Sequence, residues 1–154
     1  MKKTGVVHPN RKNIIPVAAW LLLFAVLGVI AWDRSDPHFN LLIVLFLSIL
    51  LALLVYQLLY ARNWRITLSE STVELRDIFG RTKELARDNV RWTTDVLGRN
   101  RAIHIILHDY AAKETLASVS LDCANVDLLF TLPHYGRMTP EDKSAYHYFA
   151  VKKN

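Results

Sequence analysis

The chain has 154 residues, one cysteine and a formal net charge of +5, and 52% of its residues are hydrophobic. A single cysteine excludes an intrachain disulfide framework and a zinc site built from several cysteines. A positive mean hydropathy (+0.16) beside 21% charged residues indicates that the apolar residues are gathered into particular segments. The part outside those segments is too short for a TIM barrel or a complete dinucleotide-binding fold.

Two segments, residues 14–32 and 41–60, run for 19 and 20 residues without a charge. A helix needs roughly 20 apolar residues to cross the hydrocarbon core of a bilayer. Neither segment has a polar face, which a helix on the surface of a soluble domain would have. The sequence therefore predicts two transmembrane helices, with Trp32, Tyr60 and Trp64 as interfacial anchors at or just beyond their ends.

Eight residues, 33–40, separate the two segments, and so short a connection joins only adjacent antiparallel helices. Residues 14–60 are therefore expected to form a transmembrane hairpin. Four basic side chains lie in residues 1–13 and two follow the second segment, whereas the connection has one arginine and two aspartates. The positive-inside rule then places the basic N-terminus (1–13) and the C-terminus in the cytoplasm.

From residue 64 the pattern changes to short segments in which apolar and polar residues alternate, separated by turns, as in an antiparallel meander. After these segments the spacing becomes helical, with Val126, Leu129 and Phe130 on one side of a helix that ends at Pro133. Asp122 can cap the start of this predicted helix. The pattern assigns no element to the tail, 137–154, which fits a short added strand or a mobile end. Six strands are expected, at residues 65–68, 73–76, 82–86, 89–96, 103–108 and 115–121.

The strands within RITLSESTVELRDIFGRTKELARDNVRWTTDV, the strand pair after them and the helix DCANVDLLFTLPHYG give a recognisable order. It resembles small bacterial membrane proteins in which two transmembrane helices precede one pleckstrin-homology-like (PH-like) domain. The resemblance covers residues 14 to about 136. It implies an α+β protein of the bacterial cytoplasmic (inner) membrane, with the hairpin followed by a PH-like antiparallel sandwich or barrel (61–136) capped by a C-terminal helix. The family has seven strands, and six are found here.

Few residues suggest catalysis or metal binding. His104 and His108 share one face of a predicted strand, but a metal site needs a third ligand and supporting hydrogen bonds. Cys123, in the first turn of the predicted helix, is typical of a small core residue. No nucleophile-elbow, phosphate-loop or zinc-protease motif is present in the sequence. We therefore expect no enzyme, no metal and no cofactor.

Basic residues around the predicted hairpin at 79–80 are the most informative set, because they could contact the phosphates of anionic lipids. In PH domains, headgroups are held around the loop that joins the first two strands. The expected equivalent here, residues 69–71, carries an acid and no base. Residues 61–154 hold 14 basic and 12 acidic side chains, which also fits a solvated surface of mixed charge and gives no reason to expect nucleic acid as a partner. The candidate surface and lipid-contact residues are Arg76, Arg81, Lys83, Arg87 and Arg91.

Taken with the resemblance, these features suggest a multi-pass membrane protein that displays its domain at the membrane surface. Expected partners are membrane lipids, an unidentified membrane or cytoplasmic protein, or a second copy of the chain. A free strand edge and the groove between sheet and helix are the expected docking surfaces. Two alternatives stay open: an immunity or stress-tolerance factor that neutralises a membrane-targeted toxin through its helices, and an anionic-lipid-binding module.

Overall fold

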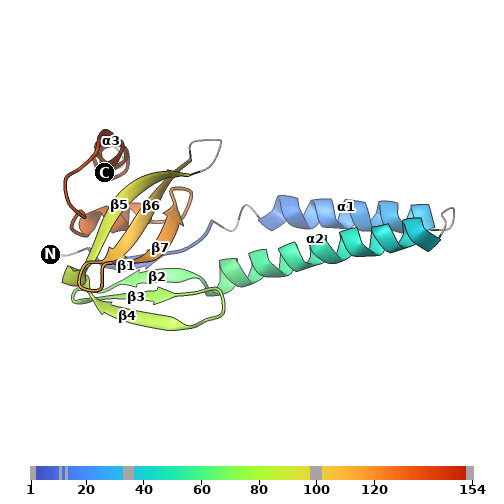
Figure 1. Cartoon of the computed structure of the whole chain (residues 1–154), viewed down its shortest axis with the longest axis horizontal. Coiled ribbons are helices and arrows are strands. Elements are labelled where there is room, and N and C mark those ends of the chain that lie inside the picture. The colour runs from blue at the N-terminus through green and yellow to red at the C-terminus, as the bar shows by residue number, and fades with distance from the viewer. Residues whose placement is uncertain (1–2, 11, 13, 33–36, 98–101, 152–154) are drawn as a thin grey trace. The chain divides into compact units, whose positions relative to one another are not determined.

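The computed structural model describes residues 3–10, 12, 14–32, 37–97 and 102–151. The chain forms two compact units, residues 10–63 and residues 1–9 with 64–154, and combines helices with two antiparallel sheets (Figure 1). The helices are α1 (Ile14–Trp32), α2 (Pro37–Asn63) and α3 (Pro140–Tyr146), with short helical turns η2 (Arg87–Asn89), η3 (Val126–Thr131) and η4 (His147–Val151). The strands are β1 (Gly5–Val7), β2 (Arg65–Leu68), β3 (Thr72–Arg76), β4 (Thr82–Ala86), β5 (Val90–Leu97), β6 (Ala102–Asp109) and β7 (Glu114–Ser120).

The unit of residues 10–63 contains α1 and α2. The first helix has the predicted bounds, and the second is longer than predicted at both ends. Its extension begins at Pro37, where a proline removes no hydrogen bond from the helix. The two helices pack antiparallel. The Phe24 and Phe46 rings lie 5.3 Å apart, and Ile43 packs against Gly28, where there is no side chain.

The outward side chains of α1 and α2 are mainly large and apolar, so this unit presents an apolar surface. Among the described residues, the one helix long and apolar enough to cross a membrane is Asn40–Asn63, and a shorter apolar stretch covers Ala18–Ile30. Tyr60, a predicted anchor, stacks on Tyr56 at 6.4 Å. The connection at 33–36 and the side chain of Trp32 lie outside the described part.

The second unit is a sandwich of two antiparallel sheets, ordered β1-β2-β3-β4 and β5-β6-β7. All six predicted strands are present, each within one or two residues of its predicted bounds. The predicted turn at 98–101 lies outside the described residues. The alternating apolar side chains meet between the sheets and form the core, which includes Ile66, Val73, Trp92, Ile105 and Val119. The period-two pattern therefore identified the buried face correctly.

No strand was predicted within the basic N-terminus, residues 1–13, but Gly5–Val7 forms β1 at the edge of the first sheet. It pairs antiparallel with β2, so that Val7 lies opposite Ile66 and is fully buried. A side chain at Gly5 would have its Cβ 2.5 Å from Leu128 Cδ1, so glycine allows β1 to approach η3. Strand β1 comes before α1 and β2 comes after α2. The helix pair is therefore inserted between two neighbouring strands of one sheet.

The helix predicted after Asp122 is present as a 3₁₀ helix and not as an α-helix. Residues 126–131 form a 3₁₀ helix, η3, after Asn125 adopts a left-handed conformation (φ 58°). Val126, Leu129 and Leu132 are buried at every third position, and this is the period of a 3₁₀ helix. The carbonyl of Leu132 accepts a hydrogen bond from the Trp92 indole at 3.0 Å, which ties this segment to β5.

Residues 137–154, to which the sequence pattern assigned no element, contain α3 and the π-helical turn η4. Thr139 and Asp142 form a capping box at the start of α3, and Pro140 occupies its first turn. Asp142 Oδ1 also accepts hydrogen bonds from the backbone N–H and the hydroxyl of Thr94, both at 2.7 Å. This one buried carboxylate therefore both starts α3 and attaches it to β5. Its second oxygen lies 3.1 Å from His134 Nε2, without hydrogen-bond alignment.

Candidate functional site

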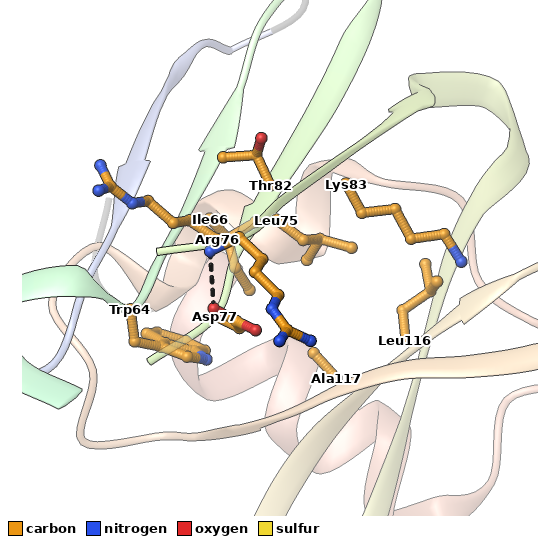
Figure 2. Close-up of a pocket in the computed structure, with 10 residues that line it drawn as sticks. Trp64, Ile66, Leu75, Arg76, Asp77, Thr82, Lys83, Leu116 and Ala117 are labelled. Carbon is orange, nitrogen blue, oxygen red and sulfur yellow. Dashed lines mark hydrogen bonds between the residues drawn. The ribbon is translucent and has the colours of Figure 1, made fainter. Parts of the chain in front are cut away.

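A cavity of about 210 Å³ opens between the two sheets near the end of β3, and we call it the cationic pocket. Its apolar side is built from both sheets and from Trp64, the residue that directly follows α2. Trp64 lies at one end of the pocket, and Lys83 and Leu116 lie at the other (Figure 2). The apolar lining residues are Trp64, Ile66, Leu75, Leu116 and Ala117.

The polar side of the pocket comes from the β3–β4 hairpin. It contains Arg76, Arg81 and Lys83, which are three of the five predicted basic residues. Arg76 is half-buried, and its Nε is buried without a hydrogen-bond partner among the described residues. Lys83 Nζ lies 3.7 Å from a carboxylate oxygen of Glu114, but both side chains are more than half exposed, so this ion pair is weak. The hairpin therefore provides cationic donors that the fold leaves largely free for a ligand.

The turn between the two strands, residues 77–81, is held in one shape. Asp77 Oδ1 accepts hydrogen bonds from the backbone N–H groups of Phe79 (2.9 Å) and Arg81 (2.8 Å). Gly80 has φ +84°, a conformation that side-chain-bearing residues rarely adopt. A Cβ there would lie 3.2 Å from Arg76 Nη2, so the guanidinium of Arg76 packs on the glycine.

Charge and size together define the ligand class that suits this pocket. Three cations face one carboxylate, Asp77, whose Oδ1 already accepts two backbone hydrogen bonds. Arginine and lysine donors of this kind recognise phosphate and carboxylate groups. The volume of about 210 Å³ is below the roughly 300–1,000 Å³ of a typical small-molecule site. The pocket therefore suits a small anionic group that carries an apolar part.

Arg87 does not belong to this pocket, and its prediction as a surface residue is wrong. The side chain is 2% exposed. Its guanidinium donates to the carbonyl oxygens of Lys3 (3.0 Å) and Ser69 (2.6 Å) and to the Thr131 hydroxyl (2.8 Å). These acceptors belong to the segment before β1, the β2–β3 turn and η3. Arg87 therefore holds three distant parts of the chain together.

Arg91 also lies apart from the pocket, on the outer face of the second sheet. Its guanidinium carbon sits 4.2 Å from the centre of the Tyr110 ring, which is the geometry of a cation–π contact. Nη1 donates to the His134 carbonyl over a long 3.5 Å. Its Nε is buried without a hydrogen-bond partner among the described residues. The predicted basic set thus divides into the pocket residues, the buried Arg87 and this separate outer-face arginine.

The histidines predicted to share a strand face form hydrogen bonds within the second sheet. His104 Nδ1 lies 3.3 Å from the Ser118 hydroxyl, and His108 Nε2 lies 2.9 Å from that of Thr93. Burial lowers the pKa of His108 below its ordinary value. Cys123 is buried in the core. Within the part of the chain that the structure describes, no group of three or more His, Cys, Asp or Glu residues could hold a metal ion.

Several pocket residues were not predicted as part of the site. Trp64 was expected as an interfacial anchor only, and Leu116 and Ala117 belong to a strand about 40 residues after the hairpin. No sequence signal connects β7 to β4. The turn at residues 77–81 could be predicted in part, because an aspartate three residues before a glycine is typical of a turn that needs a positive φ.

No family model, curated protein or solved structure matches the chain in the comparisons with known proteins.

Proposed function

We propose that this protein is a non-enzymatic membrane-anchored binding module, in which α1 and α2 form a transmembrane hairpin and the cationic pocket binds the phosphate-bearing headgroup of an anionic lipid. One observation carries the proposal: free cationic donors gather over an apolar floor that includes the first residue after α2. This supports the lipid-binding expectation. Of the four edge strands, β5 is bonded through Trp92 to residues 133–135, and His8, just after β1, is bonded to Ala124, so the edges of β4 and β7 are the ones open to strand addition.

The pairing of β1 with β2 supports the hairpin topology. These strands precede α1 and follow α2, so their antiparallel pairing requires both to lie on the same side of any membrane. The segment between them must then cross an even number of times. Helix α2 has the length and apolar composition of a membrane span, and a crossing by α2 would require a second crossing, for which α1 is the candidate. The excess of basic residues at the outer ends of the hairpin supports a cytoplasmic domain, and the resemblance to the bacterial family supports the inner membrane as its location.

Strand register supports a pocket close to the membrane surface. Arg65, two residues after the end of α2, lies opposite Arg76 in the sheet. Paired residues of antiparallel strands are about 5 Å apart. The hairpin therefore presents its cations at the end of the sheet from which the chain continues into α2. A lipid headgroup in the same leaflet would lie within reach, and an anionic leaflet attracts nearby cations.

The strand count supports a PH-like domain. With β1 included, the domain has seven strands in two antiparallel sheets, followed by a helix, which is the number that the family has. The loop that joins the first two strands is then the whole segment from residue 8 to residue 64, and not residues 69–71 as the sequence suggested. That segment ends at Trp64, in the cationic pocket.

The test uses the full-length chain in micelles of a neutral detergent. Titration with dihexanoyl-phosphatidylglycerol, followed by native mass spectrometry or calorimetry, is expected to give saturable binding, and dihexanoyl-phosphatidylcholine to give much weaker binding. Arg76→Gln removes a charged donor worth about 1.5–3 kcal/mol, so affinity should fall about 10- to 100-fold. Arg137→Gln, an exposed arginine outside the pocket, is the matched control and should leave affinity unchanged. Equal binding by both variants would contradict the proposal.

A pull-down from native membranes tests the competing expectations. The full-length chain is compared with a variant that carries Arg76→Gln and Lys83→Gln together, and with residues 10–63 alone. A protein partner retained by the first two but lost from residues 10–63 would favour protein docking, and one retained by all three would favour the toxin-immunity alternative.

A further inference from the structure

The tip of the β3–β4 hairpin, residues 77–81, carries a large apolar side chain that the described part of the chain leaves mostly exposed. Phe79 is 72% exposed, among the most exposed large apolar side chains of the described chain. Its nearest exposed charged neighbour in the turn is Arg81, and Lys83 follows on β4. An exposed phenyl ring beside cations is typical of a side chain at the interface between lipid headgroups and acyl chains.

The turn holds Phe79 in an outward position. Its backbone N–H donates to Asp77 Oδ1, the Gly80 N–H donates to the Asp77 carbonyl, and the Asp77 N–H donates to the Arg81 carbonyl at 3.0 Å. These bonds fix the backbone on both sides of the ring before any partner binds. Little conformational freedom is left to lose on contact, so the tip is preorganised for insertion.

The register of the first sheet shows at which end of the sheet this tip lies. Arg76, the last residue of β3, is opposite Arg65 at the start of β2. The tip therefore projects beyond the end of the sheet where Trp64 continues back into α2. This end of the sheet is therefore the one that Trp64 joins covalently to α2.

We infer that the β3–β4 tip inserts Phe79 into the cytoplasmic leaflet, with Arg81 and Lys83 against its anionic headgroups. The inference rests on the membrane anchoring in the proposed function, but not on headgroup binding in the pocket. Insertion adds a contact to the covalent attachment through α2. The partner is a lipid surface, because the tip joins one apolar ring to cations that complement an anionic leaflet.

The test places an environment-sensitive NBD probe at the tip of the full-length chain. Phe79→Cys is made in a Cys123→Ala background, labelled, and reconstituted into nanodiscs of phosphatidylglycerol and phosphatidylcholine, with or without doxyl-labelled lipid. Tyr110→Cys is the matched control, because Tyr110 is a 54% exposed aromatic residue in a different turn. The expected result is a blue-shifted probe at position 79 that doxyl lipid quenches at least threefold more than the probe at position 110. Equal quenching would overturn the inference.

A second measurement avoids both substitutions. Hydroxyl-radical footprinting of the unmodified chain in the same nanodiscs should oxidise Phe79 several-fold less than its exposure predicts, with Tyr110 as reference. Oxidation in line with exposure would overturn the inference even if the labelled variants do not fold. Quenching at position 79 without selective phosphatidylglycerol binding would contradict the headgroup proposal alone. Selective binding without quenching would contradict the insertion alone.

Discussion

Two arginines of one hairpin region, Arg76 and Arg87, have the same side chain in opposite environments. Arg87 is 2% exposed, and its guanidinium donates to three oxygen acceptors from distant segments. Arg76 lines a pocket, and its buried Nε has no acceptor within the described part of the chain. A guanidinium has five donors and no acceptor, so the oxygens around it decide its role. Position in a basic cluster does not distinguish an arginine that builds the fold from one that is available to a ligand.

The largest expected effect comes from removing the internally bonded arginine. Arg87→Ala leaves two carbonyls and a hydroxyl without their charged donor, so the free energy of unfolding should fall by about 3 kcal/mol. Chemical unfolding of the full-length chain in detergent measures the change. Arg81→Ala, at the exposed tip, should change it by less than about 0.5 kcal/mol. Similar losses for the two variants would show that burial does not separate the two sets of arginines.

The next effect concerns Asp142, a carboxylate bonded as completely as Arg87. Burial raises its pKa, but hydrogen bonds from Thr139 and Thr94 outweigh burial and hold the pKa of Asp142 below its ordinary value of 3.8. The carboxylate therefore stabilises the fold fully above pH 3.8, and its contribution is lost as pH falls through the lower folded-state pKa. Asp142→Ala should cost about 2 kcal/mol at pH 7 and release α3 from β5.

An acid titration followed by tryptophan fluorescence tests whether stability falls as the Asp142 carboxylate is protonated. The wild-type chain should lose stability below pH 3.8 more steeply than Asp142→Asn, which has no charge to lose at this position. If the two proteins lost stability equally steeply at acid pH, the stabilising role of the Asp142 carboxylate would be contradicted. Glu141→Gln, on the same helix but exposed, serves as control.

Substitutions at Gly80 and Gly136 separate the effect of backbone strain from the effect of contact with Arg76. Gly80 and Gly136 have nearly equal φ angles, +84° and +82°, so alanine at either should cost about 1 kcal/mol. A Cβ at Gly80 presses on Arg76 Nη2, whereas one at Gly136 has nothing within 4 Å. Gly80→Ala should therefore also weaken phosphatidylglycerol binding several-fold, and Gly136→Ala should not. Equal effects on affinity would show that the turn does not position Arg76.

The smallest effect is expected at the rim of the pocket. Glu114→Gln removes the exposed partner of Lys83, so stability should change by less than about 0.5 kcal/mol. Lys83 becomes free for an anionic ligand, and affinity for dihexanoyl-phosphatidylglycerol should rise by up to a few-fold. Calorimetry measures this affinity for Glu114→Gln and for the control Glu141→Gln. A weaker affinity would show that Glu114 belongs to the binding site.

The regular parts of this fold were predictable because each repeats a pattern over several residues. Six strands and both long helices follow from periods and from apolar length. Strand β1 was missed because three residues carry no readable period and its partner lies beyond the helix pair. The start of α3 was readable, because Thr139 and Asp142 have the spacing of a capping box.

The candidate site was predictable only in the part that is local in sequence. Arg76, Arg81 and Lys83 lie within one hairpin, so their proximity follows from the turn between them. The apolar side of the pocket depends on how the second sheet packs, which no local pattern records. The burial of Arg87 depends on acceptors supplied by residues 3, 69 and 131.

The insertion of the helix pair between β1 and β2 has a mechanical consequence. The chain leaves the domain at β1 and re-enters it at β2, so the domain is tethered to its helices at two points. A protease that cuts between β1 and α1 leaves residues 64–154 covalently joined to α2, whereas a cut between α2 and β2 leaves them held only by the pairing of β1 with β2. The helix pair therefore interrupts the first sheet in sequence without interrupting it in space, since β1 and β2 remain paired on either side of the insertion.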